Sequence, residues 1–353
     1  MTDFSRRTFV KGAFAFGACS ALTSYGLFAQ GAAVSPARLI DVHQHYVSPG
    51  YFAVMTRLNG VSPVQGYGLW SKYTPALAIE AMDQAGVATT ILSQFSRAIG
   101  VRFANDGETR RAVRELNEYA TARMVGAYKG RFGLFAVLPM PDIDGSLREI
   151  EYAIDTLNAD GVALLTSYDD KWLGDPAFDA VFAELNRRKA VVFVHPIDAS
   201  CCRPVMNGVT PQTLEYPTDT TRAIMNLIVS NTATRCPDVK FIFSHAGGTL
   251  VSIAGRFLGD AVSAKGLAGP AEPNSRLAHV RRFYYDTAGS TNPVQMQSLR
   301  LLVPDSQIVF GTDYPFANGP AAHVAGLRES GFAAQALQGI YRDNALKFLT
   351  KFA

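Results

Sequence analysis

Residues 39–45 read LIDVHQH, a short apolar run that ends in two histidines separated by one residue. Three later apolar runs also end in side chains that can bind a metal: AVVFV is followed by His195, VKFIFS by His245 and QIVFGT by Asp313. A hydrophobic core does not require polar groups at the ends of four β-like runs. A metal site at the mouth of a parallel barrel does, because the carboxyl ends of the strands meet there. The pattern therefore predicts an enzyme.

The two histidines of the first run, His43 and His45, are predicted to share one cation. Residues i and i+2 of a strand point the same way, so both imidazoles can face the barrel mouth. Imidazoles suit zinc, iron, nickel or cobalt, and the carboxylate of Asp313 would help to hold the water-bearing position. A binuclear site needs a bridging ligand, commonly a lysine after the fourth strand, where this chain reads GVALLTSY and the nearest lysine is Lys171. We therefore expect one divalent metal ion, with Zn2+ as first choice and Mn2+, Fe2+ or Co2+ as alternatives.

Short β-branched or aromatic runs alternate with longer segments of helical period along most of the chain. Eight such strands alternating with helices predict the α/β class and a (β/α)8 TIM barrel of the metal-dependent hydrolase type. A doubly wound open sheet is the alternative, but it would show a glycine-rich turn after its first strand, where this chain has two histidines. The predicted strands are residues 38–43, 88–93, 132–138, 161–165, 190–194, 239–244, 283–286 and 307–311.

Residues 1–33 are predicted to be a Tat-type signal peptide. Arg6 and Arg7 form a twin arginine, which a modest apolar stretch and small residues up to Ala33 follow. We therefore expect export to the periplasm by the twin-arginine route. The rest of the chain, residues 34–353, is expected to form a single barrel domain.

The charge of the chain gives no basis for binding nucleic acid or an anionic membrane surface. Without residues 1–33 the chain has 30 basic and 29 acidic side chains. No later apolar run reaches the length of a membrane span. The three cysteines that remain, Cys201, Cys202 and Cys236, are too few for a disulfide framework. The expected partner is therefore a small-molecule substrate.

Two long connections, residues 46–73 and 197–217, are expected to be lids or binding loops at the barrel mouth. Candidates for the substrate pocket follow from their positions in loops at this end of the barrel. They are Arg97, Trp70, Phe316 and Tyr46. A mixture of rings and one guanidinium suits an aromatic carboxylic acid.

Four motifs carry a resemblance to a known family: LIDVHQH, VVFVHP, FSHAGG and FGTDYPF, in this order. They resemble the amidohydrolase superfamily, in particular the branch that contains aminocarboxymuconate semialdehyde decarboxylase and the γ-resorcylate and 6-methylsalicylate decarboxylases. The segments YKGRFGLFAVLPMPD, ADGVALLTSY and FYYDTAGS, which lie between the motifs, are similar to the family as well. The resemblance extends from Leu39 to Phe348.

The resemblance implies His43, His45, His195 and Asp313 as the metal ligands. His245 would then lie beside the metal without binding it and would act in proton transfer or orientation. Asp313 would be both a ligand and a catalytic residue, although an aspartate before Tyr-Pro can also simply cap a turn.

Four further residues are interpreted through the same resemblance or through their position. Arg256 matches an arginine that reaches the substrate carboxylate in a neighbouring subunit, which implies a homodimer or larger homo-oligomer; a solvated helix arginine is the alternative. Glu215 and Asp219 fall in a segment that lines the pocket in the family. Asp41, two residues before His43, is expected to orient a ligand or to bind backbone at the strand end.

Two enzyme functions compete, and a non-catalytic metal-binding protein is a third class that the five intact site residues disfavour. The first is non-oxidative decarboxylation of a small aromatic or enol-type acid, in which a proton from Asp313 or through His245 reaches the carbon that bears the carboxylate. A muconate-type variant, in which activated water adds first, stays open. The second is hydrolysis of a lactone, ester or amide by a metal-activated water. A decarboxylase must hold a carboxylate near the metal, which would give Arg256 a purpose, whereas export favours the hydrolase.

Overall fold

The computed structural model describes residues 38–50, 72–94, 105–199 and 208–353. These residues all belong to one compact unit, Pro36–Ala353. The predicted signal peptide, residues 1–33, lies outside the described residues and stays a prediction. Among the described residues, no helix combines the length and the apolar character needed to cross a membrane.

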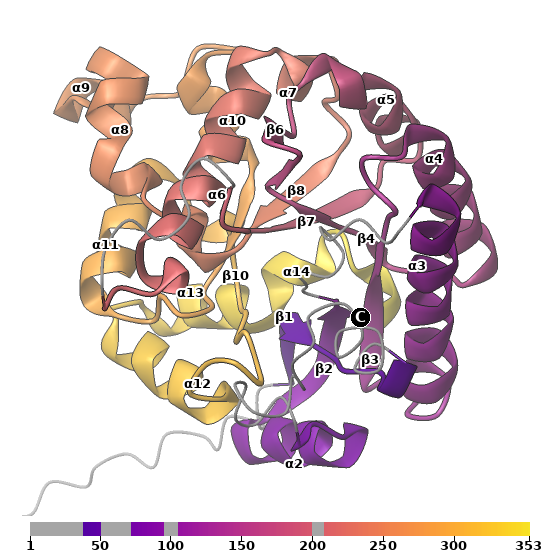
Figure 1. The fold of residues 1–353 in the computed structure, drawn as a ribbon. Coiled ribbons are helices and arrows are strands. Elements are labelled where there is room, and N and C mark those ends of the chain that lie inside the picture. The colour runs from indigo at the N-terminus through magenta and orange to yellow at the C-terminus, as the bar shows by residue number, and fades with distance from the viewer. Residues whose placement is uncertain (1–37, 51–71, 95–104, 200–207) are drawn as a thin grey trace, which may run out of the picture. The chain divides into compact units, whose positions relative to one another are not determined.

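Eight parallel strands form one sheet in which each strand pairs with its neighbours in sequence order. The first and last strands approach each other, since the N–H of Val42 donates to the carbonyl of Phe310 (2.9 Å) and that of His45 to Tyr314 (2.8 Å). The predicted (β/α)8 barrel is confirmed (Figure 1). The strands are β1 Leu39–His45, β2 Val87–Ser93, β3 Phe132–Val137, β4 Gly161–Leu165, β7 Val191–His195, β8 Lys240–Phe243, β9 Tyr284–Asp286 and β10 Ile308–Val309.

Helices follow the strands and cover the outside of the barrel (Figure 1). Their ends obey local rules: Thr74 caps the helix that Pro75 opens, and Gly86 ends it in the left-handed conformation (φ 74°). The helices are α2 Pro75–Ala85, α3 Asp106–Ala120, α4 Ile143–Glu151, α5 Asp179–Arg187, α6 Pro211–Val229, α7 Thr232–Arg235, α8 Leu250–Leu258, α9 Ala264–Ala268, α10 Arg276–Arg282, α11 Pro293–Leu302, α12 Pro320–Glu329, α13 Ala334–Gln338 and α14 Asn344–Leu346.

The barrel interior is filled by a cluster of buried apolar side chains that includes Ile40, Val42 and Phe193. Two residues near the C-terminus, Ala345 and Leu349, belong to the same cluster. A second and larger cluster lies between the strands and the surrounding helices. The interior is therefore a packed core, which leaves the carboxyl ends of the strands as the place for a site.

An irregularity in β1 decides which side chains of the first motif face inward. The pairing register of β1 with β2 shifts between Asp41 and Gln44. Val42 belongs to the cluster inside the barrel. The ring of the next residue, His43, meets the ring of Phe193 from the same cluster edge to face, with the two ring centres 4.9 Å apart. Two consecutive residues therefore face the interior, as a β-bulge allows. The strict alternation that the sequence predicts does not hold here, and Asp41 does not share the face of His43.

Two local features differ from expectation. The long connection predicted at residues 197–217 ends early, because α6 begins at Pro211 and continues through Pro217. A short antiparallel hairpin, β5 Ser167–Tyr168 with β6 Lys171–Trp172, follows the fourth barrel strand.

Candidate active site

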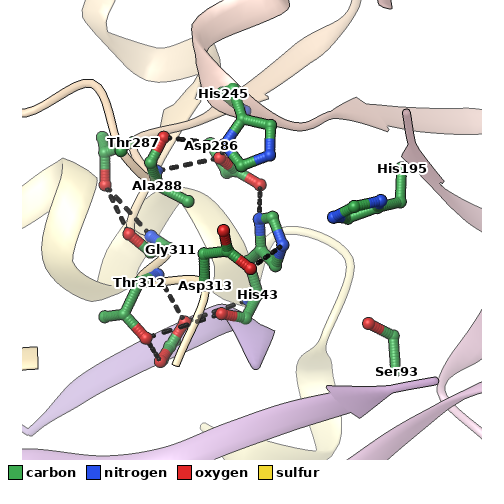
Figure 2. A network of polar contacts seen from close by, with 12 residues as sticks. His43, Ser93, His195, His245, Asp286, Thr287, Ala288, Gly311, Thr312 and Asp313 are labelled. Carbon is green, nitrogen blue, oxygen red and sulfur yellow. Dashed lines mark hydrogen bonds and ion pairs between the residues drawn. The ribbon is translucent and has the colours of Figure 1, made fainter. Parts of the chain in front are cut away.

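The structure brings the four predicted ligands together. One ligand atom from each of His43, His45, His195 and Asp313 lies within 4.8 Å of the others. The first two come from β1, the third ends β7 and the last follows β10. The three histidines are buried, whereas the side chain of Asp313 is 19% exposed. Figure 2 shows His43, His195 and Asp313 pointing toward one another.

Each of the three imidazoles is held on its Nδ1 side by an oxygen. The distances from Nδ1 are 2.7 Å for His43 to Asp286 Oδ2, 3.3 Å for His45 to the carbonyl of Ser93, and 2.9 Å for His195 to the carbonyl of Pro196. A carbonyl or carboxylate oxygen can only accept, so Nδ1 carries a proton and, in the neutral form of each ring, Nε2 carries the lone pair. Partners of this kind set the tautomer and orientation of metal-binding histidines.

The Nε2 atoms and one carboxylate oxygen converge on one point. Nε2 of His43 lies 3.1 Å from Nε2 of His45, and Asp313 Oδ1 lies 2.9 Å from the latter and 3.4 Å from the former. Electron pairs this close repel unless they share a positive charge. The convergence of nitrogen and oxygen donors therefore fits a divalent cation.

Burial and neighbouring charges act differently on these groups. Burial lowers the pKa of His45, and burial together with the neighbouring histidines lowers that of His195 well below its usual value, which favours the neutral form that binds a metal. Burial also acts to lower the pKa of His43, but the carboxylates of Asp286 and Asp313 outweigh it and raise the pKa to about 10. For Asp313, burial is outweighed by His43 and His45, which hold its pKa well below its usual range.

His245 lies beside this group in an unusual backbone conformation. It follows β8 after Ser244, with a positive φ of 54°. Its Nδ1 donates to the carbonyl of Ala288 at 3.0 Å, and its ring centre lies 5.1 Å from that of His43 and 5.6 Å from that of His195. It is not part of the four-residue cluster. This position agrees with the expected place beside the metal, and the role itself stays a prediction.

A cavity of about 400 Å3 opens onto these side chains. Its wall includes His195, His245 and Asp313. The predicted pocket residue Phe316 also lies on the wall, and its ring centre is 5.4 Å from that of His45. The other described residues of the wall are Gln212, Thr213, Tyr216, Pro217, Gly289, Ser290 and Gln295. The described part of the wall is thus neutral apart from the metal-ligand region, and the volume suits a small ligand.

Comparisons with known proteins agree with this geometry. The amidohydrolase family matches residues 40–351. The chain belongs to the amidohydrolase family. It is 36% identical to a decarboxylase of Aspergillus niger over 89% of this chain and 88% of the relative. It is 35% identical to 6-methylsalicylic acid decarboxylase of Penicillium expansum over 83% and 88% of the two chains.

A solved structure shares the fold of this amidohydrolase. It is a dihydroxybenzoic acid decarboxylase from Polaromonas with bound manganese and the inhibitor 2-nitroresorcinol. The TM-score is 0.72 at 19% identity, over 88% of this chain and 96% of the other. The likeness supports the barrel fold.

The other residues predicted to bind substrate in this amidohydrolase lie in different places. Tyr46 is fully buried in the core. Its hydroxyl donates to the carbonyl of Leu116 on α3 at 3.0 Å, so the side chain packs against this helix and does not face the cavity. Arg256 is exposed on α8 and is not among the described residues of the cavity wall. Arg97 and Trp70 lie outside the described residues.

The first turns of α6 contribute to the cavity through residues that the sequence did not indicate. Gln212, Thr213 and Tyr216 lie on the wall, whereas the predicted Glu215 and Asp219 do not. Asp219 instead accepts hydrogen bonds from Thr166 and Trp172 and ties α6 to the β5–β6 hairpin. The reason is the face that α6 turns toward the cavity, which carries Gln212, Thr213, Tyr216 and Pro217 and leaves Glu215 and Asp219 to one side.

Two buried aspartates of this amidohydrolase contact His43 from different sides. Asp286 accepts from its ring, whereas Asp41 accepts from its backbone N–H at 3.0 Å and from Thr312. Burial raises the pKa of Asp41 to about 7, although the hydrogen bond from Thr312 opposes the shift. The sequence predicts that Asp41 either orients a ligand or binds backbone, and its contacts with the N–H groups of His43 and Thr312 are of the second kind. The only sequence signal of Asp286 is its position at the end of a strand.

Proposed function

We propose that this protein is a metal-dependent decarboxylase of a small aromatic acid with an oxygen substituent next to its carboxyl group. One observation carries the proposal: a single cavity of about 400 Å3 is bordered by His195 and Asp313 of the ligand cluster, by His245 and by the ring of Phe316. A metal centre, a proton-transfer group and an aromatic surface are what such a reaction needs at one place. The relatives at 35–36% identity, which are named as decarboxylases, favour this reaction over hydrolysis.

In the proposed reaction the cluster binds a divalent metal through His43, His45, His195 and Asp313. When bound, the metal supplies positive charge for the carboxylate and the adjacent oxygen of the substrate. The low pKa of Asp313 keeps it in the anionic form that a ligand needs and makes it a poor acid. His245, whose Nδ1 is engaged by Ala288, is left with Nε2 for proton transfer.

The balance of the reaction follows from these roles. His245 in its protonated form gives a proton to the ring carbon that bears the carboxylate. The bond between that carbon and the carboxylate then breaks, its electron pair restores the aromatic ring, and carbon dioxide leaves. His245 regains its proton from solvent. The ring of Phe316 would lie against the substrate ring.

The test is carbon dioxide release from salicylate-type acids by metal-loaded protein, with lactones and aryl esters assayed in parallel for acid release. We expect carbon dioxide from at least one acid with an ortho oxygen, and loss of that activity in His245→Ala. Acid release from esters without carbon dioxide would mean that the reaction is hydrolysis.

We propose zinc as the physiological metal. Three imidazoles and one carboxylate suit Zn2+, and the manganese in the Polaromonas enzyme makes Mn2+ the main alternative. Metal analysis of protein purified from its own host, followed by reconstitution of apoprotein with each ion, distinguishes the two.

We propose that the protein is exported by the twin-arginine route and acts as a homodimer or larger homo-oligomer. The twin arginine at Arg6 and Arg7 supports export, and the exposed position of Arg256 on α8 is compatible with a role across a subunit boundary. Cell fractionation with and without Arg6→Lys and Arg7→Lys tests the first. Sedimentation of the mature protein tests whether it is a homo-oligomer. Mixing inactive Arg256→Ala subunits with inactive His195→Ala subunits tests whether Arg256 acts in a neighbouring subunit, because activity should then return in the mixture.

A further inference from the structure

Asp286 is a fully buried carboxylate at the end of β9, and both of its oxygens are engaged. Oδ2 lies 2.7 Å from His43 Nδ1. Oδ1 accepts from the backbone N–H of His245 and from that of Ala288, each at 2.9 Å. Figure 2 shows the carboxylate between the rings of His43 and His245. It therefore contacts a predicted ligand and the predicted proton-transfer residue at once.

The Oδ2 contact decides which nitrogen of His43 can bind a metal. An acceptor at Nδ1 holds the proton there and leaves the lone pair on Nε2. That Nε2 is the atom that lies 3.1 Å from His45 Nε2 and 3.4 Å from Asp313 Oδ1. If the proton moved to Nε2, His43 would present an N–H to the cluster and could not be a ligand.

The Oδ1 contacts hold the segment that orients His245. His245 has a positive φ, which is unfavourable for a residue with a side chain, and the bond from its N–H to Asp286 stabilises that conformation. The second bond fixes Ala288, whose carbonyl accepts from His245 Nδ1. The backbone and the ring of His245 are thus both tied to this one carboxylate.

We propose that Asp286 is a positioning residue that fixes the tautomer of His43 for metal binding through Oδ2 and the orientation of His245 through Oδ1. The inference rests on the metal centre of the proposed function but not on the reaction that the centre catalyses. It makes a prediction that a purely structural role does not make. The closer isostere, asparagine, should impair metal binding more than alanine does.

The reason lies in the two backbone N–H groups. In Asp286→Asn they hold the amide oxygen at the Oδ1 position, because an amide NH2 there would face two donors. The NH2 then faces His43 Nδ1, which must become an acceptor and transfer its proton to Nε2. In Asp286→Ala neither group faces Nδ1, so His43 can keep its tautomer with water as the acceptor.

Asp41→Asn provides a matched control. Asp41 is also fully buried, and its Oδ1 also accepts from two backbone N–H groups, those of His43 and Thr312. Its Oδ2, however, faces the hydroxyl of Thr312 at 2.6 Å, and a hydroxyl can reverse from donor to acceptor. The same substitution therefore forces no imidazole tautomer, and zinc affinity should stay close to that of the wild type.

The experiment measures Zn2+ affinity of the full chain and its variants by competition with a chromophoric chelator, without substrate. We expect Asp286→Asn to lose about 100-fold and Asp286→Ala about 10-fold, the range known for residues that orient metal ligands. At saturating Zn2+ the alanine variant should still lose turnover, because His245 is no longer held. Affinity in Asp286→Asn equal to or above that in Asp286→Ala, or an equal loss in Asp41→Asn, would overturn the proposal.

Two further readouts keep the proposal testable if a variant fails to fold or the reaction is wrong. Long-range 15N NMR of the zinc-loaded wild type should show His43 protonated at Nδ1, and protonation at Nε2 contradicts the assignment. Zinc binding without carbon dioxide release would overturn only the proposed function. Absence of zinc binding by the wild type would overturn both.

Discussion

His195 and His245 follow very similar apolar runs, yet the structure gives them different surroundings. His195 is the last residue of a regular strand, and its ring lies in the ligand cluster. His245 comes after Ser244, where the backbone has left the strand and entered the left-handed region, and its ring lies beside the cluster. A single motif, an apolar run that ends in histidine, thus predicts the end of the barrel at which a side chain lies. The backbone after the strand decides whether that side chain joins the ligand cluster.

The strongest test of this difference is His195→Ala. One of three converging imidazoles disappears, and we expect Zn2+ affinity to fall by more than the roughly 100-fold that loss of a supporting residue can cause. Turnover should be lost with the metal. Chelator competition and metal analysis measure the effect. Retention of near wild-type zinc affinity would remove His195 from the ligand set.

The contrasting variant is His245→Ala, which should bind zinc about as well as the wild type. Turnover should fall by about 10²- to 10⁴-fold, the usual contribution of a proton-transfer residue. Metal analysis and steady-state kinetics of the same preparation separate the two effects. A metal loss as large as that of His195→Ala would show that His245 is a ligand and that the two histidines do not differ.

The pH dependence of metal binding sharpens the comparison further. His43, with a pKa raised to about 10, is protonated in the metal-free site at neutral pH and must release that proton when a metal binds. His195 has a pKa well below its usual value and is already neutral. Zn2+ affinity should therefore rise about tenfold per pH unit between about pH 6.5 and 8.5, the slope for one proton released.

Calorimetry in buffers of different ionisation enthalpy measures the proton directly, and we expect one proton per Zn2+ at pH 7.5. A pH-independent affinity would mean that the carboxylates do not hold a proton on His43. The Asp286→Asn variant, which removes the charge of one carboxylate, should release less than one proton.

Gly248 is expected to keep the loop after His245 close to α6. It has a φ of 67°, and a Cβ at this position would lie 1.9 Å from the carbonyl oxygen of Pro217. Gly259 has similar φ and ψ angles, but no atom lies within 4 Å of the position that its Cβ would take. Gly259→Ala is therefore the matched control. Each alanine should cost about 1–3 kcal/mol through backbone strain alone.

Gly248→Ala should cost more than its control and should also lower turnover, because the clash displaces the loop that carries His245. Denaturant unfolding and kinetics measure both quantities. Equal destabilisation in the two variants would show that the contact with α6 does not matter.

The smallest effect is expected for Phe316→Leu. The ring lies on the cavity wall and is 36% exposed, so the substitution removes an aromatic contact of about 0.5–1.5 kcal/mol without opening the core. We expect KM for an aromatic acid to rise a few-fold, with zinc affinity unchanged. An unchanged KM would mean that the substrate ring lies elsewhere in the cavity.

The sequence by itself determined the elements and the end of the barrel that carries the chemistry. The eight runs at residues 38–311 alternate with helical periods, and hydrophobic period is a local property that needs no knowledge of contacts. The positions of His43, His45, His195 and Asp313 at the ends of three of those runs follow from the same periods. Strand ends meet in any parallel barrel, so the cluster of Figure 2 could be predicted.

The tertiary structure alone decided how those residues are oriented and supported. The bulge of β1, the left-handed backbone of His245 and the face of α6 that lines the cavity leave no periodic signal in the sequence. The contact between Asp286 and His43 joins residues 243 positions apart. Such contacts depend on how the barrel closes and how loops pack above it. Local sequence sets which groups are available, whereas long-range packing sets which nitrogen each imidazole presents.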